Sequence, residues 1–370
     1  MKYRHIIQAA METPWAILPA KLEQIAGFLA RKARGEQLSE AEIAAAVGDR
    51  QPGGAQVQRV GSVAVIPVLG TIAHRMEQFQ SLSGPGGTST NLLANRIREA
   101  AADPAVSSII LDIDSGGGAV GGVPELAELI MQLKQQKKII AVASDFAASA
   151  AYWIAAAASE VVVTPSGQVG SIGVFMMHQD ISKMAEMEGV KTTFVHAGPH
   201  KVEGNSFEPL SEEARASLQG KVDGYYEMFV KSVAQGRGVT PARVRADFGG
   251  GRMLLAKDAL AAGMVDRIDT MDGTLERLLR KAAARAGGGP RAEINTKRDF
   301  ESFLRDVGGY SHAESKRIAS EGFGTEAPRD EEGAPAAAGT AEEPVNEGQN
   351  PQEAETLKRE LKQLADSFRS

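Results

Sequence analysis

The stretch KKIIAVASDFAASAAYWIAAAAS, residues 137–159, decides the fold of this chain. Its first part is a strand-like apolar run, and its second part is almost pure alanine with Tyr152 and Trp153, a composition that predicts a helix. Ser149 stands where the strand pattern gives way to the helix pattern. Its position alone leaves two interpretations open. It either caps the helix, because serine is a preferred N-cap residue, or it is a nucleophile held where the helix begins.

The alternation of strand and helix patterns continues on both sides of this stretch. Apolar runs rich in β-branched residues predict strands at residues 63–70, 107–114, 139–144, 161–164, 172–177 and 192–197. Helical patterns lie between them, and a long amphipathic helix is predicted at residues 211–235. Near-continuous apolar strands separated by helices are typical of parallel strands buried on both faces. The sequence therefore predicts an α/β fold with parallel sheets.

Four regions differ in their pattern. Residues 1–58 are predicted to be an N-terminal helical segment, and residues 59–285 carry the α/β alternation. Residues 286–324 are predicted to form a short helical segment. Residues 325–370 are predicted to form an acidic linker that ends in an amphipathic helix. The linker is rich in Pro, Ala, Gly and Glu and cannot bury enough apolar surface to offset its ordering entropy, so it is predicted to be disordered.

Composition narrows the class of protein. A chain of 370 residues with 43% hydrophobic and 24% charged residues predicts a soluble globular protein with a sizeable core. The net charge of −6 argues against general nucleic-acid binding. The chain has no cysteine, which excludes disulfides, thiolate nucleophiles and cysteine metal sites. No apolar run is long enough for a signal peptide or a membrane span, so we expect a protein without a membrane partner.

A glycine-rich loop, SGGGAVGGVPE at residues 115–125, follows the predicted strand at 107–114. Glycines at the end of a parallel strand allow a ligand to approach backbone amides closely. One interpretation is a phosphate cradle, but G-x-x-x-x-G-K-[ST] is absent and G-x-G-x-x-G fits only loosely. The other is an oxyanion hole, in which one amide of this loop acts with the amide of Ala150 at the start of the next helix.

A serine nucleophile needs a base. None of the six histidines lies in a recognisable triad context, and the G-x-S-x-G elbow is absent. A Ser-Lys dyad is the other route, and Lys201 in HAGPHKVEGNSF is the candidate. A lysine acts as a base only when it is neutral, which requires an apolar pocket and a hydroxyl partner. Ser171 in GSIGV is a possible partner.

Six blocks in this order resemble the serine peptidases of the signal peptide peptidase A family, within the Clp protease/crotonase superfamily. They are VAVIPVLGTI, LDIDSGGGAVGG, ASDFAASAAYWIAAAAS, GQVGSIGVFMMH, AGPHKVEGN and GRMLLAKDALAAGMVD. The N-terminal stretch PWAILPAKLEQIAGFLARKARGE and the lack of a membrane anchor resemble the phage and prophage branch, the head maturation or capsid assembly proteases. The resemblance covers roughly residues 59–270 strongly and the N-terminal helices more weakly.

The resemblance implies a Clp protease/crotonase-like spiral of β-β-α units, with N-terminal helices and a largely disordered C-terminal tail. It makes Ser149 the nucleophile and Lys201 the general base. It makes the amides of Gly117 and Ala150 the oxyanion donors, and Ser171 the hydroxyl that orients the base. The loop reads SGGG where many relatives have Ser-Pro-Gly-Gly, which leaves the donating glycine open by one position.

The implied function is a serine endopeptidase with a Ser-Lys dyad that cleaves phage capsid or scaffold proteins during head assembly. Such an enzyme needs no metal and no organic cofactor, and we expect a homo-oligomer in the host cytoplasm and transiently in the procapsid. One alternative is a bacterial protease that degrades signal peptides or envelope proteins. The others are an acyl-CoA enzyme of the crotonase type and a non-catalytic capsid scaffold. The C-terminal tail is interpreted as a scaffold or docking element that is open to self-cleavage.

Overall fold

The computed structural model describes residues 13–33, 57–74 and 87–286, together with eight single or paired residues between 298 and 320. The chain divides into two compact units, residues 1–320 and 321–370, and the fold below belongs to the first. The acidic tail predicted at 325–370 lies outside the described residues, as do residues 1–12 and 34–56 of the predicted N-terminal helical segment. The segment 286–324 lies largely outside them.

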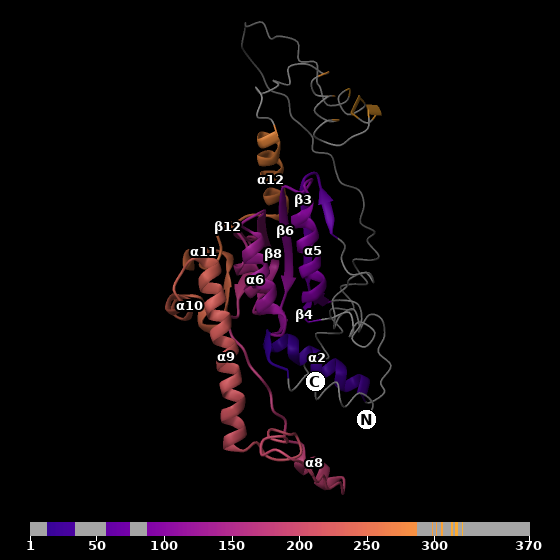
Figure 1. Ribbon diagram of the computed structural model, residues 1–370, viewed down its shortest axis with the longest axis vertical. Coiled ribbons are helices and arrows are strands. Elements are labelled where there is room, and N and C mark those ends of the chain that lie inside the picture. The colour runs from indigo at the N-terminus through magenta and orange to yellow at the C-terminus, as the bar shows by residue number, and fades with distance from the viewer. Residues whose placement is uncertain are drawn as a thin grey trace, which may run out of the picture. The chain divides into compact units, whose positions relative to one another are not determined.

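The centre of the first unit is an eight-stranded sheet in which most neighbouring strands run parallel (Figure 1). β8 lies in the middle and pairs in parallel with β6, β9 and β10, while β3 pairs in parallel with β6 and β12 with β9. β2 and β11 are antiparallel edge strands. This architecture confirms the predicted α/β fold with parallel sheets. The strands are β2 (Gln58–Val60), β3 (Val63–Leu69), β6 (Ser108–Ser115), β8 (Lys138–Ala148), β9 (Glu160–Val163), β10 (Gln168–Gly170), β11 (Met253–Leu255) and β12 (Arg267–Ile268).

Both faces of this sheet are covered, which explains the continuous apolar runs. On one face, Ile109 and Leu111 pack into the main core with α5, α6, α7 and α9. On the other face, Ile110 and Ile140 pack against Leu278 of α12. Successive residues of a strand point to opposite faces, so a strand buried on both sides needs apolar residues at every position. The helices are α5 (Thr90–Ala102), α6 (Val123–Leu133), α7 (Ala150–Ala156), α9 (Glu212–Arg237), α10 (Pro241–Asp247), α11 (Ala256–Ala262) and α12 (Met271–Ala286).

A second, four-stranded sheet has the order β1-β7-β4-β5. Its strands are β1 (Trp15–Ile17), β4 (Thr71–Ala73), β5 (Gly87–Ser89) and β7 (Gly117–Ala119). β1 precedes α2 (Pro19–Ala33), so the prediction that residues 1–58 are helical is wrong at residues 15–17. These three residues form a strand because the edge of β7 is free to pair with them and an apolar cluster buries Trp15 and Ile17.

Two of the predicted strands do not form. Residues 172–177 contain one isolated antiparallel bridge, between Phe175 and Trp15, and the strand lies earlier, at β10. Residues 192–197 have no regular structure, and Val195 is 98% exposed. Their β-branched and aromatic residues favour a strand only where a neighbouring strand and a packed face exist. The short helix α8 (Ser182–Met187) precedes this run, and turns at residues 199–204 follow it.

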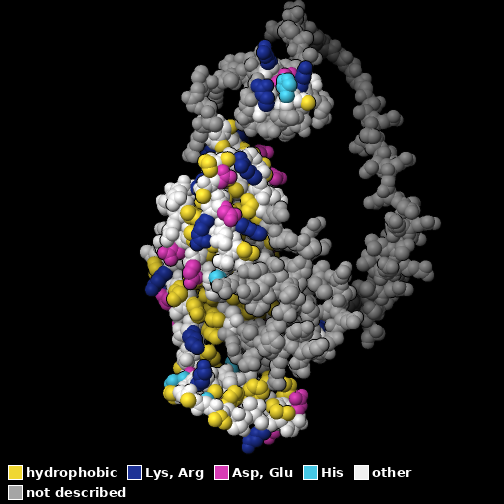
Figure 2. Space-filling model, turned by 45° about the vertical axis from the view of Figure 1, so that its right-hand side comes forward, with side chains coloured by type: hydrophobic (Ala, Val, Ile, Leu, Met, Phe, Trp, Pro, Cys, Tyr) yellow, Lys and Arg dark blue, Asp and Glu magenta, His cyan; other side chains and the backbone are white. Residues whose placement is uncertain are grey.

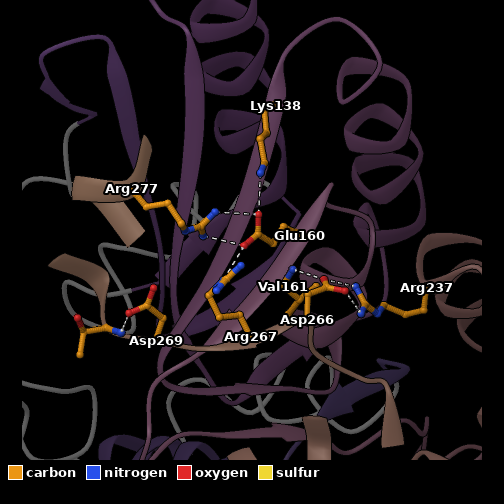
Figure 3. A network of polar contacts seen from close by, with 9 residues as sticks. Lys138, Glu160, Val161, Arg237, Asp266, Arg267, Asp269 and Arg277 are labelled. Carbon is orange, nitrogen blue, oxygen red and sulfur yellow. Dashed lines mark hydrogen bonds and ion pairs between the residues drawn. The ribbon is translucent and has the colours of Figure 1, made fainter. Parts of the chain in front are cut away.

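A network of charged side chains ties α12 and β12 to the sheet (Figure 3). Glu160, at the start of β9, accepts hydrogen bonds from Lys138 at 2.7 Å and from Arg277 at 2.7 Å, and Arg267 lies 3.4 Å away. Burial alone would raise the pKa of Glu160, but the hydrogen bonds from Lys138 and Arg277 outweigh it and hold the pKa at about 2. The carboxylate is therefore ionised and stabilises the packing of α12.

A second ion pair lies in the same network. Arg237, near the end of α9, donates two hydrogen bonds of 2.7 Å to Asp266, which also accepts one from the amide of Val161. Burial would raise the pKa of Asp266, but these hydrogen bonds lower it. The pair fixes the end of α9 beside the turn that leads into β12. No helix in the described part of the chain is both long and apolar enough to span a membrane.

Candidate active site

The carboxyl ends of three strands meet at Ser149. In the register of the sheet, Ser115 at the end of β6 is opposite Ala147 of β8, and Gly170 at the end of β10 is opposite Ala148. Ser149 follows β8 directly and precedes α7. Loops at the carboxyl ends of parallel strands are where open α/β sheets place their ligands. The topology therefore brings the glycine loop, Ser149 and the segment after β10 to one place.

The backbone of Ser149 is strained. Its φ is 55° and its ψ is −116°, a region that residues with a Cβ rarely adopt. The conformation is held by two hydrogen bonds, since the Ser149 amide donates to Gly170 O at 2.7 Å and its carbonyl accepts from Trp153 N at 2.9 Å. Backbone strain of this kind clusters at active sites, where surrounding structure holds it in place.

The side chain of Ser149 does not cap α7. Although Ser149 occupies the N-cap position, its hydroxyl makes no capping hydrogen bond. Its Oγ donates a long hydrogen bond of 3.5 Å to Gly173 O, and the residue is 1% exposed. Of the two interpretations that the sequence leaves open, the structure therefore contradicts the cap. A hydroxyl that its own helix does not engage is available to act as a nucleophile once a base activates it.

Ser171 shares this unusual backbone. Among the described residues, Ser149 and Ser171 are the two non-glycine residues with positive φ, and the φ of Ser171 is 56°. Ser171 is 9% exposed, its amide donates to Arg252 O at 2.9 Å, and it directly follows Gly170, the residue that accepts from Ser149. The two serines predicted for the site are thus neighbours, held by consecutive residues of one segment.

The glycine loop lies against the end of β8. Gly117 has a φ of 94°, and a Cβ at this position would lie 3.0 Å from Ala148 O. Its amide donates to Ser115 Oγ at 3.1 Å, and the Ser115 hydroxyl in turn donates to Gly70 O. Ser115 is the serine of the SGGG run. A serine directly before these glycines is the sequence feature that could have predicted its hydrogen bond with the Gly117 amide. The structure therefore places Gly117 beside Ser149, with its amide engaged by Ser115.

Helix α7 carries the second predicted donor and is firmly anchored. Ala150 is its first residue, so its amide has no acceptor within the helix. Trp153 stacks on Phe229 of α9 with ring centroids 4.4 Å apart and 8° between the planes. The hydroxyl of Tyr152 donates to Met264 O at 2.9 Å. Such a stack adds about 0.5–1.5 kcal/mol beyond burial, so the start of α7 is rigidly positioned.

Lys201 is not brought to Ser149 in the described residues. It lies in a turn in which its amide donates to Gly198 O at 3.2 Å, and its side chain is exposed. The turn belongs to the segment between β10 and α9 that contains α8, and Figure 1 shows this segment beyond the N-terminal end of α9. The structure groups Ser149, Ser171, Gly117 and Ala150, and it leaves the predicted base on an exposed surface.

His74, His178 and His200 have partners away from Ser149. His74 Nδ1 lies 3.1 Å from Thr90 Oγ1, and His178 Nε2 lies 3.0 Å from Asn205 O. His200 belongs to a group with Glu203 and Glu213 whose ligand atoms lie within 4.8 Å of one another. Imidazole and carboxylate groups are metal ligands, so this group could hold a divalent cation beside Lys201.

Comparison with known proteins identifies relatives over the same part of the chain. The model of peptidase family S49 matches residues 131–285, which include Ser149, Ser171 and Lys201. Head-tail preconnector protein GP5 of Enterobacteria phage P21 is 35% identical over 249 residues, covering 64% of this chain and 49% of that protein. Capsid assembly protease C of Escherichia phage lambda is 35% identical over 221 residues, covering 60% of this chain and 49% of that protein.

Two further matches lie outside phages. A putative protease of Synechocystis sp. is 30% identical over 203 residues, which are 55% of this chain and 72% of that protein. A solved ClpP1 mutant from Listeria monocytogenes is similar with a TM-score of 0.34 and 15% identity, over 56% of this chain and 93% of that chain. The chain thus spans about half the length of the two phage relatives and most of the length of the Synechocystis protein.

Proposed function

The chain belongs to peptidase family S49, and from this premise we propose that it is a serine endopeptidase that cleaves capsid or scaffold proteins during assembly of a phage head. The observation that carries the proposal is the buried, strained Ser149, whose hydroxyl has no capping role. The choice of substrate is supported by the similarity to the two phage proteins, of which one is a capsid assembly protease and the other a head-tail preconnector protein. The same chemistry acting on signal peptides or envelope proteins is the second candidate.

In the proposed reaction, Ser149 Oγ attacks the scissile carbonyl while the neutral amine of Lys201 takes its proton. The C–N bond of the tetrahedral intermediate then breaks, and the protonated amine supplies a proton to the leaving nitrogen. The amides of Gly117 and Ala150 stabilise the oxyanion, and for this the Gly117 amide exchanges its hydrogen bond to Ser115 Oγ for one to the substrate. The Ser171 hydroxyl orients the amine. Water completes the cycle by hydrolysing the acyl-enzyme, and no step needs a metal or an organic cofactor.

Lys201 is exposed, so the proposal requires a surface that buries its amine. A lysine is neutral near pH 7 only when it is desolvated, so the segment that carries Lys201 must pack against another surface. The same segment exposes large apolar side chains, with Met187 84% and Val190 54% exposed. Figure 2 shows hydrophobic side chains gathered at the lower end of the molecule, where α8 lies in Figure 1. We infer that a second copy of the chain covers this segment and that Lys201 serves the Ser149 of a neighbouring subunit.

Complementation between two inactive variants tests both parts of the proposal. Ser149→Ala and Lys201→Met should each abolish cleavage of the capsid protein encoded with this chain, whereas Lys191→Met, on the same exposed segment, should remain active. Co-expressed Ser149→Ala and Lys201→Met chains should regain about a quarter of the wild-type activity if the dyad forms between subunits, because that fraction of chance pairings joins two intact residues.

The outcomes separate the alternatives. Cleavage by Ser149→Ala would refute the nucleophile and with it the proposed function. Inactive mixed oligomers would refute the arrangement between subunits and leave a dyad within one chain. Selective cleavage of a signal peptide over the capsid protein would favour the second candidate substrate.

A further inference from the structure

The strand β1 fills a gap between two backbone edges. On one side it pairs antiparallel with β7, where Val120 N donates to Pro14 O at 3.0 Å and Leu18 N donates to Gly116 O at 2.9 Å. On its other side, Trp15 and Phe175 exchange two hydrogen bonds of 2.9 and 3.0 Å. An extended stretch of this chain is thus held by main-chain hydrogen bonds on both of its edges.

Both edges flank Ser149. β7 begins at Gly117, and a Cβ at Gly117 would lie 2.3 Å from Ala16 O and 3.0 Å from Ala148 O, the residue before Ser149. The other edge contains Gly173, whose carbonyl oxygen lies 3.5 Å from Ser149 Oγ. β1 therefore runs along the backbone that surrounds the proposed nucleophile.

Ser149 is also covered in this arrangement. Its exposed fraction is 1%, so a substrate carbonyl cannot reach its hydroxyl in the structure as it stands. The start of α2 lies on the glycine loop, because a Cβ at Gly116 would meet the side chains of Lys21 at 2.9 Å and Leu18 at 3.7 Å. Access to the site requires that something next to Ser149 move.

We propose that β1 occupies the groove that binds an extended segment of substrate, so that residues 13–18 are an internal competitor that leaves before a substrate binds. Extended peptides bind proteins by adding a strand to a free sheet edge, with main-chain hydrogen bonds giving affinity and side-chain pockets giving specificity. β1 makes this kind of contact with β7 and with Phe175. The inference rests on the proposed function, since it concerns the groove of the same Ser149.

The side chains of β1 indicate the class of substrate. Trp15 and Ile17, two positions apart, lie on one side of the strand in a cluster with Ala119, Phe175 and Met177. Ala16 lies on the other side, fully buried in the main core. The groove therefore selects an extended segment with two large apolar residues that flank a small one.

Labelling of Ser149 by a fluorophosphonate, followed by mass spectrometry, tests the inference. The hydroxyl displaces fluoride from the probe, so the rate measures access to the serine. The double variant Trp15→Glu, Ile17→Glu places two charges in the apolar cluster and should expel β1. The control Ala20→Glu, Gln24→Glu adds the same charges at exposed positions of α2.

A tethered segment competes at an effective concentration on the order of millimolar, so expelling it should raise the labelling rate about tenfold or more. The peptide TPWAIL, which has the sequence of residues 13–18, should slow labelling of the variant back toward the wild-type rate, and a scrambled peptide should not. If the double variant Trp15→Glu, Ile17→Glu keeps the wild-type melting temperature and is labelled no faster than the wild type and the control, the inference is overturned. A label that mass spectrometry finds on another residue of the wild type and not on Ser149 would instead refute the nucleophile itself.

A second measurement needs no substitution in β1. A peptidyl fluorophosphonate attached to Ser149 of the wild type fills the groove, so it should increase hydrogen exchange at the amides of Trp15 and Leu18, which the structure shows bonded to Phe175 O and Gly116 O. Unchanged protection of both amides in the labelled protein would show that β1 is a permanent strand and would overturn the inference.

Discussion

Replacing Ser149 by glycine should stabilise the protein while it abolishes activity. The φ of 55° and ψ of −116° place Ser149 in a region that costs a residue with a Cβ about 1–3 kcal/mol, and glycine adopts it without that cost. Glycine also gives the unfolded chain more conformational freedom, which opposes the gain by about 0.5–1 kcal/mol. With a strain of about 2 kcal/mol, the net gain of Ser149→Gly over Ser149→Ala is about 1 kcal/mol. In a domain of this size, this corresponds to a melting temperature about 2–4 °C higher.

Scanning calorimetry and urea titration of the two variants give the comparison. Ser149→Ala should itself cost little, because the hydroxyl makes no capping hydrogen bond. Ser108 in β6 is the matched control, a buried serine whose φ is not among the positive ones. There, Ser108→Gly should be less stable than Ser108→Ala by about 0.5–1 kcal/mol. If Ser149→Gly is also less stable than Ser149→Ala, the backbone at residue 149 is not strained and the structural argument for a nucleophile fails.

Two further predictions concern the elements that support the site. Because the pKa of Glu160 is about 2, against 4.5 for an ordinary glutamate, its ion pairs stabilise the fold above pH 4.5 and lose this contribution as the pH falls from about 4.5 to 2. Glu160→Gln should lower the free energy of unfolding at pH 7 by about 2 kcal/mol and flatten its dependence on pH in that acid range, as measured by urea titration. On α9, a Cβ at Gly236 would lie 2.1 Å from Ala156 O, whereas Gly224 has open space around it. Gly236→Ala should therefore lower the melting temperature. Gly224→Ala should raise it, because alanine is favoured over glycine in helices by about 1 kcal/mol.

The sequence was sufficient to predict the part of the fold that carries the nucleophile. The run at 139–144 and the alanine-rich run after Ser149 appear in the structure as β8 and α7, with the serine between them. This prediction was possible because β8 is buried on both faces, so its apolar pattern depends on burial alone. The glycine loop was recognisable for a related reason, because its backbone must pass close to neighbouring chains.

The sequence could not place elements whose conformation depends on a distant neighbour. β1 is a strand because β7 and Phe175 offer it hydrogen bonds, and nothing within residues 13–18 encodes that partnership. The run at 192–197 has strand-forming residues but finds no such neighbour. Lys201 was a candidate base from its place in HAGPHKVEGNSF, the resemblance to a family assigned it the role, and that role stays a prediction. Local pattern predicts what an element would form, and tertiary contacts decide whether it does.

The stacking of Trp153 on Phe229 fixes α9 at one point along its length, so a small rotation of the helix at that point moves its distant end. The helix is clamped at Phe229, and about 17 residues of it extend back to Glu212, a reach of roughly 25 Å at 1.5 Å per residue. A tilt of about 5° at the clamp would move the far end, and the turn of Lys201 next to it, by about 2 Å, and an error of about 1 Å in a reacting group can cost a hundredfold in rate. The packing of these two rings thus controls where the amine of Lys201 lies. Substitutions of Trp153 or Phe229 should therefore reduce the rate of catalysis more than they reduce the stability of the fold.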